Sequence, residues 1–170
     1  QYVTPIFDST RWDRFRLRPG DIVVCTPVKS CTTWTQMLCA LLVHQSPTFP
    51  QPLNQLSRWL ERNREPLDEL LAVYEAQRHR RIVKTHTPID GLPYDPAVSY
   101  VFCGRDPRAV FFSMRDHIAN ASEESAKDVR RRAGLPEDFE LPDEPQQLFA
   151  TWLTTPYAEG LEDGFPVGSV

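Results

Sequence analysis

Lysine is scarce in this chain of 170 residues, where it occurs only at positions 29, 84 and 127, whereas arginine is frequent. A solvated lysine can usually be replaced by arginine, but a site that needs the compact charge of an ammonium group cannot use arginine instead. Lys29 and Lys84 both stand near the ends of short apolar runs, so we predict that they are functional. The arginine-rich, lysine-poor usage also points to a bacterial source with a GC-rich genome.

Cysteine pairs at C-x-x-C spacing are absent, although the chain has four cysteines, at positions 25, 31, 39 and 103. Their spacing argues against a zinc site and against a disulfide framework, so we expect no metal. We expect three of them to be buried thiols in a reducing compartment. Cys31 is the exception, because a helix N-terminus can lower the pKa of a thiol and make it reactive.

Long apolar runs are missing too, and so is a charged start followed by an apolar h-region. The sequence therefore predicts no membrane span, no secretion and a cytoplasmic location. The net charge of −4 argues against a nucleic-acid partner, so local cations and helix termini must supply any anion site. With 41% hydrophobic residues, one globular domain over residues 1–170 with a small ligand is expected.

The most informative segment connects a strand to a helix. Residues 22–26 form a short apolar run, and residues 32–44 carry apolar side chains around most of a helix circumference. We predict a strand and then a helix that is buried on several sides. The loop between them is rich in hydroxyl groups and contains Lys29. Because the first N–H groups of a helix are unpaired and carry positive partial charge, this strand, loop and helix predict a phosphate site.

Strands and helices alternate along most of the chain. Further strands are expected over residues 81–85 and 99–104, and further helices over residues 53–62, 66–80, 107–121 and 145–157. This alternation predicts an α/β fold of three layers, α/β/α, with a central parallel sheet. Ligands of such sheets bind beyond the carboxyl ends of the strands, where we expect Lys29, Lys84, His86 and Arg105.

Residues 122–147 differ in composition, since they are charged and punctuated by proline. We interpret them as a lid or mobile excursion, with a solvated surface loop as the alternative. The tail from Glu159 to Val170 shows no clear element.

Three motifs occur in the order that one family uses. The segment Lys29-Ser30-Cys31-Thr32-Thr33-Trp34 resembles the K-S-G-T-T-W loop of sulfotransferases that use 3′-phosphoadenosine 5′-phosphosulfate (PAPS). Lys84-Thr85-His86 is similar to the K-T-H that ends the family's second core strand. Arg105-Asp106-Pro107-Arg108, with Ser113 further on, resembles its 3′-phosphate segment. The resemblance covers roughly residues 18–157.

The resemblance implies roles for these residues. Lys29 would contact the sulfate and the bridging oxygen that leaves, and Lys84 would assist it electrostatically. His86 would be the general base that takes the acceptor proton. The other implied contacts are with PAPS: the 5′-phosphate at Ser30, Cys31, Thr32 and Thr33, the adenine at Trp34, and the 3′-phosphate at Arg105 and Ser113.

Each of these residues has a simpler alternative. The hydroxyl groups before the helix could be N-caps, and Trp34 could belong to the core. His86 could be a hydrogen-bonded loop residue, although alternation along a strand would place it on the same side as Lys84. Arg105 could pair with Asp106 or another acidic residue, and Lys29 could be an ordinary lysine of a surface loop.

The chain departs from the family pattern in three places. Pro27-Val28 stands where an aromatic residue and proline ordinarily precede the lysine. Cys31 replaces glycine, and if that position requires positive φ its Cβ costs about 1 kcal/mol. The family's C-terminal R-K-G and G-x-W-K elements have no match here.

The function that follows from the resemblance is transfer of the sulfuryl group from PAPS to a hydroxyl, or an amine, of a small-molecule acceptor, without a metal. One alternative is a P-loop phosphotransferase of the kinase type, against which the absence of a G-K-[ST] loop end counts. Another is a non-catalytic module that binds adenosine bisphosphate. The identity of the acceptor and the oligomeric state have no readable signal in the sequence.

Overall fold

The computed structural model describes residues 1–4, 6–132, 134–138 and 144–154. The chain divides into two compact units, of which the first comprises Gln1–Tyr2 and Phe7–Gly104, and the second comprises Val3–Ile6 and Arg105–Val170. The expectation of one domain over residues 1–170 stays a prediction. No helix in these described stretches is both long enough and apolar enough to cross a bilayer.

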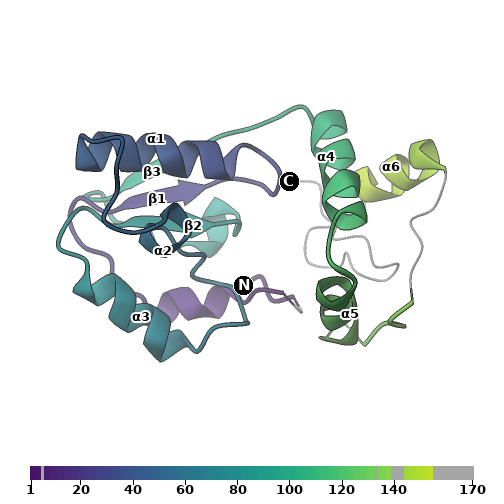
Figure 1. Ribbon diagram of the computed structural model, residues 1–170, viewed down its shortest axis with the longest axis horizontal. Coiled ribbons are helices and arrows are strands. Elements are labelled where there is room, and N and C mark those ends of the chain that lie inside the picture. Colours follow the sequence, from purple (N-terminus) through teal and green to yellow (C-terminus); the bar gives the residue numbers. More distant parts are fainter. Residues whose placement is uncertain (5, 133, 139–143, 155–170) are drawn as a thin grey trace. The chain divides into compact units, whose positions relative to one another are not determined.

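A parallel sheet of three strands lies at the centre of the first unit (Figure 1). Its strands are β1 (Ile22–Cys25), β2 (Ile82–Thr85) and β3 (Ser99–Phe102), and β1 lies between the other two. Cys25 pairs with Thr85 on one side and with Phe102 on the other, so all three strands end at the same level. The predicted α/β class with a central parallel sheet is confirmed.

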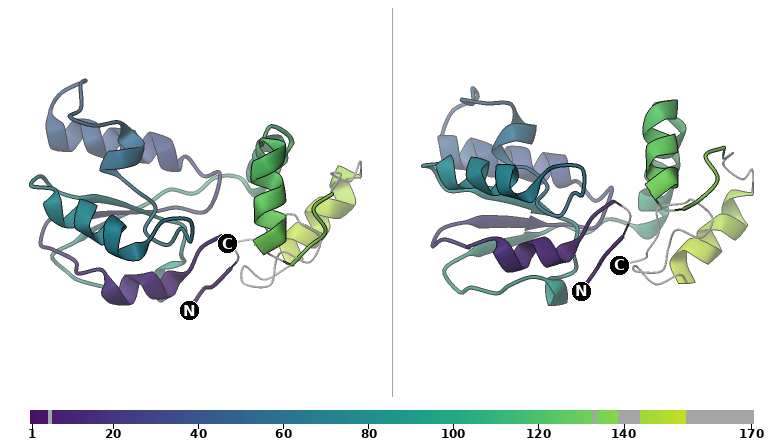
Figure 2. Two further views of the ribbon diagram at one scale, coloured as in Figure 1. Left: turned by 60° about the horizontal axis from the view of Figure 1, so that its bottom comes forward. Right: turned by 90° about the horizontal axis from the view of Figure 1, so that it is seen from below.

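Helices cover both faces of this sheet, as Figure 1 and the left view of Figure 2 show. Ile22, Val24 and Ile82 form a core with α1 (Thr32–His44) on one face. The intervening residues Val23 and Val83 point to the other face, where they pack with side chains of η1 (Ser9–Arg14) and α3 (Leu67–Ala76). Side chains thus alternate between the two faces, as the period of two of an extended strand requires.

A buried ion pair fixes the amino ends of β1 and β2. The guanidinium of Arg81 donates from Nε to Asp21 Oδ1 at 2.9 Å and from Nη2 to Asp21 Oδ2 at 2.5 Å. Both side chains are almost fully buried, and the guanidinium also lies 4.6 Å from the ring centroid of Phe15. A buried charge pair of this kind is strongly coupled to the fold, because removal of one partner leaves the other charge uncompensated.

The helix predicted over residues 53–62 is largely wrong. Helix α2 spans only Leu53–Leu56, and the chain that follows lies along β2. The N–H of Lys84 donates to the carbonyl of Arg58 at 3.2 Å, and Trp59 forms a parallel bridge with Lys84. Pairing with β2 satisfies the backbone groups of this segment, and this tertiary interaction outweighs a weak helical pattern.

Two further helix predictions need correction. The helix expected over residues 66–80 ends at Ala76, where Arg18 donates to the backbone carbonyls of Glu75 and Gln77. The helix over residues 32–44 is present with these bounds but is not buried on several sides. Its exposed face carries Trp34, Leu38 and Leu42, at 75%, 58% and 71% exposure, because only the opposite face packs on the sheet.

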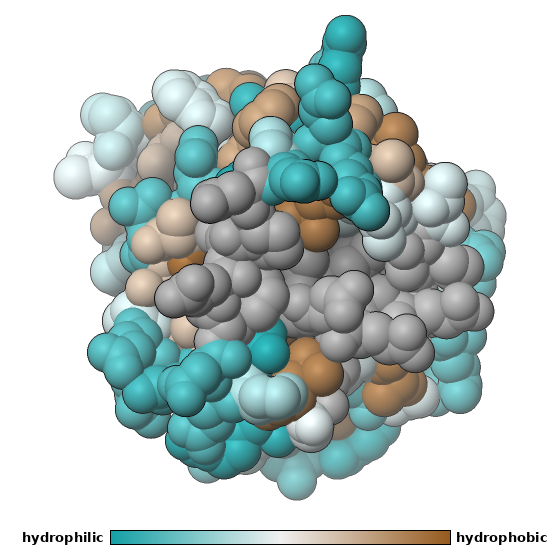
Figure 3. All heavy atoms as spheres, turned by 90° about the vertical axis from the view of Figure 1, so that its right-hand side faces the viewer, coloured by the Kyte–Doolittle hydropathy of each residue, from teal (hydrophilic) through white to brown (hydrophobic). Residues whose placement is uncertain are grey.

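The second unit contains α4 (Pro107–Ala119), α5 (Glu123–Arg132) and α6 (Pro145–Thr154). Phe111 of α4 packs edge to face on Phe149 of α6, at 5.2 Å between ring centroids. Helix α5 is highly charged, with ion pairs from Lys127 to Glu123 and from Arg132 to Asp128. The coloured part of the face in Figure 3 carries broad groups of hydrophilic side chains with smaller hydrophobic areas between them.

Several predictions fall partly outside the described residues. Within residues 122–147, predicted as a lid, the structure describes α5 and the start of α6, but positions 133 and 139–143 lie outside it. The predicted helix over residues 145–157 is described to Thr154, and the tail from Glu159 lies outside the described residues.

Candidate functional site

The loop after β1 turns tightly before α1 begins. Lys29 and Cys31 both adopt the left-handed conformation, with φ of 58° and 62°. The hydroxyl groups of Thr26, at the end of the strand, and Thr32, at the start of the helix, lie 2.6 Å apart and close the loop. Cys31 therefore occupies a conformation that favours glycine, so the expected cost of its Cβ applies here.

The amino end of α1 presents donors to this loop. Cys31 is the N-cap residue but makes no side-chain cap hydrogen bond, so the predicted alternative of hydroxyl N-caps is not what the structure shows. The first N–H groups of an α-helix have no partner within the helix, and an anion can accept from them. Ser30 is buried, Lys29 is half-buried, and Thr33 is exposed. Trp34 is 75% exposed, which excludes the alternative that this residue belongs to the core.

Lys84 and His86 both contact the indole ring of Trp59. The Nζ of Lys84 is 4.8 Å from the ring centroid of Trp59, and the His86 ring meets the same indole edge to face at 4.9 Å. The expected placement of the two side chains on one side of the strand is thus found. Lys84 itself lies within β2 and not beyond its end as predicted, whereas His86 is the first residue after the strand.

His86 is held as a neutral ring with a defined tautomer. Its Nδ1 lies 2.8 Å from the carbonyl oxygen of Thr26, which can only accept, so Nδ1 carries the proton and Nε2 is the basic nitrogen. The pKa of His86 is lowered to about 3, first by burial and then by the nearby charge of Lys84, while this hydrogen bond acts in the opposite direction. The ring is therefore unprotonated at neutral pH, as a general base must be.

The pKa of Lys84 is also lower than its ordinary value. Burial lowers the pKa of its ammonium group to about 8, with a smaller contribution from the charge of Arg62, while Glu61 acts in the opposite direction. The group is mostly charged at neutral pH and loses its charge at mildly alkaline pH.

A buried carboxylate beside this turn has no counterpart among the predicted site residues. Glu61 Oε1 accepts from Trp12 Nε1 at 2.7 Å, from Thr87 Oγ1 at 2.8 Å and from the hydroxyl of Thr85. The helix predicted over residues 53–62 gives no reason to place Glu61 or Trp59 in the site, so sequence reasoning misses both. The signal in the sequence is an acidic residue directly after the apolar pair Trp59-Leu60. Glu61 is fully buried in the structure, and acidic residues are rarely buried unless they are paired or hydrogen-bonded.

Arg105 and Ser113 belong to the second unit. Arg105 lies two residues before the start of α4, and Ser113 is a half-buried residue within that helix. Asp106 caps α4 by accepting from the N–H of Arg108 at 2.9 Å, and its carboxylate pairs with the Arg108 guanidinium at 2.8 Å. A joint site of Arg105 and Ser113 with Lys29 stays a prediction.

The four cysteines are free thiols. Cys25 and Cys39 are buried as expected and Cys31 is exposed, but the expectation of a third buried thiol is wrong, since Cys103 is half-buried. Burial raises the pKa of the Cys25 thiol to about 11. Among the residues that the structure describes, no three His, Cys, Asp or Glu side chains gather in a way that could hold a metal ion.

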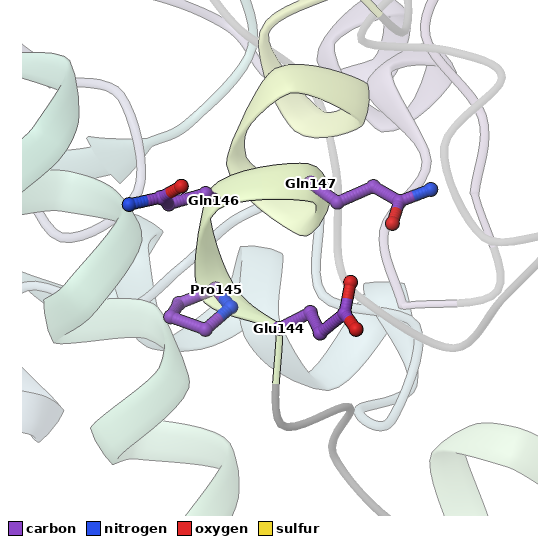
Figure 4. Close-up of a pocket in the computed structure, with 4 residues that line it drawn as sticks. All are labelled: Glu144, Pro145, Gln146 and Gln147. Atoms are coloured by element: carbon purple, nitrogen blue, oxygen red, sulfur yellow. The ribbon is translucent and has the colours of Figure 1, made fainter.

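A hollow of about 410 Å³ lies at the start of α6 and contains none of the predicted site residues among its described lining. Figure 4 shows Gln146 on one side of the helix and Gln147 with Glu144 on the other, so these polar groups do not converge on one point. The described lining consists of Glu144, Pro145, Gln146 and Gln147.

Comparison with known proteins finds relatives over most of the chain. The chain is 41% identical over 164 residues to a glycolipid sulfotransferase of Mycobacterium bovis, a match that covers 91% of this chain and 50% of that protein. It is 47% identical over 123 residues to a glycolipid sulfotransferase of Mycobacterium tuberculosis, with 72% and 38% covered. The chain thus spans half or less of the length of these curated relatives.

Two solved structures share the fold. The crystal structure of retinol dehydratase with retinol and PAP has a TM-score of 0.54 and 17% identity, and covers 96% of this chain and 75% of that chain. The same protein with androsterone and the inactive cofactor PAP has a TM-score of 0.53 and 23% identity, with 66% and 43% covered. The family profile described as the sulfotransferase domain matches residues 19–157, which is most of the sequence. This chain belongs to the sulfotransferase family.

Proposed function

We propose that the chain binds PAPS and takes part in transfer of its sulfuryl group to a hydroxyl group of a small-molecule acceptor. The observation that carries this proposal is the bond from His86 Nδ1 to the carbonyl of Thr26. It ties the candidate base directly to the first residue of the candidate phosphate loop. Because Cys25 and Thr85 are paired in register, the base and the loop start from the same level of the sheet.

The residues present fit the donor. The loop combines the positive end of α1, the ammonium of Lys29 and the hydroxyl groups of Ser30, Thr32 and Thr33, which suit a phosphate group. We assign Cys31 to the same set through its backbone N–H group. Trp34, with 75% of its surface exposed, offers a flat apolar face for the adenine. Arg105 and Ser113 are assigned to the 3′-phosphate, because a guanidinium binds phosphate oxygens well.

His86 and the two lysines would carry the chemistry. PAPS supplies an activated sulfuryl group, whose bond to the phosphate oxygen breaks as the acceptor oxygen forms its bond to sulfur. The acceptor hydroxyl gives its proton to Nε2 of His86. Lys29 and Lys84 stabilise the negative charge that grows on the sulfuryl and departing phosphate oxygens, in a site where burial strengthens electrostatic interactions.

The acceptor that we propose is a sugar hydroxyl of a glycolipid. Support comes from the two mycobacterial relatives, which are named glycolipid sulfotransferases and are 41% and 47% identical. We also propose that the reaction takes place in the cytoplasm, since an exposed thiol such as Cys31 suits a reducing compartment. Cell fractionation followed by immunoblotting tests this location, and recovery of the protein in an extracellular fraction would contradict it.

Incubation of the purified chain with PAPS labelled in sulfur tests the proposed reaction. The acceptors are a glycolipid with free sugar hydroxyls and a simple phenol, and ATP with magnesium replaces PAPS in a parallel reaction. We expect labelled product with PAPS alone. Phosphorylated product with ATP would favour a phosphotransferase, and tight binding of adenosine 3′,5′-bisphosphate without any transfer would show a non-catalytic binding module.

A further inference from the structure

One side chain, that of Glu61, is hydrogen-bonded to the turn that carries His86. Thr85 and Thr87 flank His86, and the hydroxyl groups of both donate to the same oxygen of Glu61, Oε1. The hydroxyl of Thr85 also accepts from the N–H of Thr87 at 3.0 Å. The two peptides on either side of the candidate base are thus connected to each other and to one carboxyl group.

Glu61 approaches the turn from the face opposite to His86. Thr85 follows Lys84 in β2, so its side chain points to the face of η1, where Trp12 also donates to Glu61 Oε1. The backbone of Glu61 is held as well, since its carbonyl accepts from the N–H of Asp8 at 2.9 Å. Glu61 therefore lies away from the face on which His86 and Trp59 meet, so it acts on the reaction through the turn and, at longer range, through its charge on Lys84, whose pKa it raises.

Burial of the Glu61 carboxyl group in the core lowers the stability of the fold. Glu61 is fully buried, and its second oxygen, Oε2, has no hydrogen-bond partner among the described residues. An apolar side chain of similar size would avoid the cost of burying this polar group. An unsatisfied buried polar atom in a native fold calls for an explanation, and a functional role is one.

We propose that Glu61 is a positioning residue for His86, because it clamps the threonines on both sides of the base and so keeps Nδ1 on the Thr26 carbonyl. This inference rests on the proposed function, in which Nε2 of His86 accepts the proton of the acceptor hydroxyl. Without the clamp, the turn can rotate and the ring loses its fixed tautomer. Displacement of a catalytic group by about 1 Å can lower a rate about 100-fold.

Nitrogen-15 NMR of the histidine rings tests the proposal in the full chain, because it reports which ring nitrogen carries the proton. His86 signals are identified by their loss in His86→Asn. In the unsubstituted chain we expect the Nδ1–H tautomer alone. In Glu61→Ala we expect a mixture of both tautomers, whereas Glu61→Gln, which keeps an acceptor oxygen in the same place, should retain the Nδ1–H tautomer.

Steady-state kinetics provide the second readout. We expect kcat to fall about 100-fold in Glu61→Ala with little change in the KM for PAPS, and most of kcat to return in Glu61→Gln. Tyr74→Phe is the matched control, since Tyr74 is equally buried and its hydroxyl donates at 2.6 Å to the carbonyl of Arg58 in the same segment. This variant should lose stability but keep kcat and the His86 tautomer.

Thermal unfolding shows whether Glu61→Ala folds. If it does not, Thr87→Val is the second test, because this variant removes one of the two threonine hydroxyl groups that donate to Glu61. A mixed His86 tautomer in Thr87→Val supports the proposal. The proposal is overturned if the folded Glu61→Ala or Thr87→Val chain keeps a pure Nδ1–H tautomer, or if Tyr74→Phe disturbs the tautomer equally. Absence of any PAPS-dependent turnover in the unsubstituted chain would instead refute the proposed function, and the NMR result would still decide the role of Glu61.

Discussion

The Nδ1 of His86 lies 2.8 Å from the carbonyl oxygen of Thr26, so the residue that follows β2 is joined to the residue that follows β1. This hydrogen bond joins two segments that are 60 positions apart in sequence, at the carboxyl ends of the strands. A candidate base and a candidate anion-binding loop are thus in direct contact.

Acid should destabilise the chain through His86. Its pKa in the folded state, about 3, is below the ordinary value of 6.5, so the unfolded chain binds a proton that the folded chain does not. Stability is therefore lost as the pH falls below about 6.5 and continues to be lost down to about 3. Between pH 6.5 and 4.5 this one group should lower the free energy of unfolding by about 2 kcal/mol.

Urea unfolding at several pH values measures this effect. The His86→Asn variant should show a weaker dependence on pH over this range, while His117→Asn, at an exposed position of α4, should behave like the unsubstituted chain. Equal pH dependence in His86→Asn and the unsubstituted chain would argue against a buried, neutral His86.

Turnover should fall on the alkaline side because Lys84 loses its charge. The pKa of this group is about 8, so kcat/KM should be constant near neutral pH and decline above about pH 8. Lys84→Arg should be slower, because the guanidinium has a different shape, but its activity should persist to higher pH. A pH profile of kcat/KM for both proteins decides this, and an unchanged alkaline limb in Lys84→Arg would contradict the assignment.

Replacement of Cys31 by glycine should stabilise the chain. Cys31 has φ of 62°, where a side chain with a Cβ is strained and glycine is not. We expect Cys31→Gly to raise the free energy of unfolding by up to about 1 kcal/mol. Cys31→Ala retains the Cβ and should bring no such gain, so thermal unfolding of the two variants separates relief of backbone strain from loss of the thiol.

Loss of the buried ion pair should be far more damaging. Asp21→Ala leaves the fully buried guanidinium of Arg81 without its main partner and should cost about 3 to 5 kcal/mol. Arg108→Ala breaks the exposed pair with Asp106 and should leave the unfolding midpoint nearly unchanged. Denaturant unfolding of both variants provides the comparison, and similar midpoints would show that the Asp21 pair adds little.

The sequence predicted the parts of the fold that local patterns determine. The run Ile22-Val23-Val24 predicted β1, and the helical spacing from Thr32 to His44 predicted α1 with its observed bounds. The segment around Trp59 was not predictable in the same way, because its conformation depends on pairing with Lys84, which lies 25 positions further along the chain. Local propensity does not contain such a partner.

The candidate site shows the same division. Lys29, Lys84 and His86 were recognisable because their motifs are contiguous in sequence. Glu61 was not, since its role appears only when Trp12, Thr85 and Thr87 converge on one oxygen. The exposed face of α1 was also mispredicted, because an apolar pattern shows that side chains are hydrophobic and does not show how many faces are covered.

We propose that the loop containing Lys29 binds the donor nucleotide. Isothermal titration calorimetry with adenosine 3′,5′-bisphosphate tests it most directly, with Lys29→Ala compared with Lys127→Ala, whose lysine pairs with Glu123 on α5. We predict binding by the unsubstituted chain and by Lys127→Ala, and affinity at least about 10-fold weaker in Lys29→Ala, as expected for loss of a charge-assisted phosphate contact. Equal affinity in Lys29→Ala and Lys127→Ala would show that this loop does not hold the nucleotide.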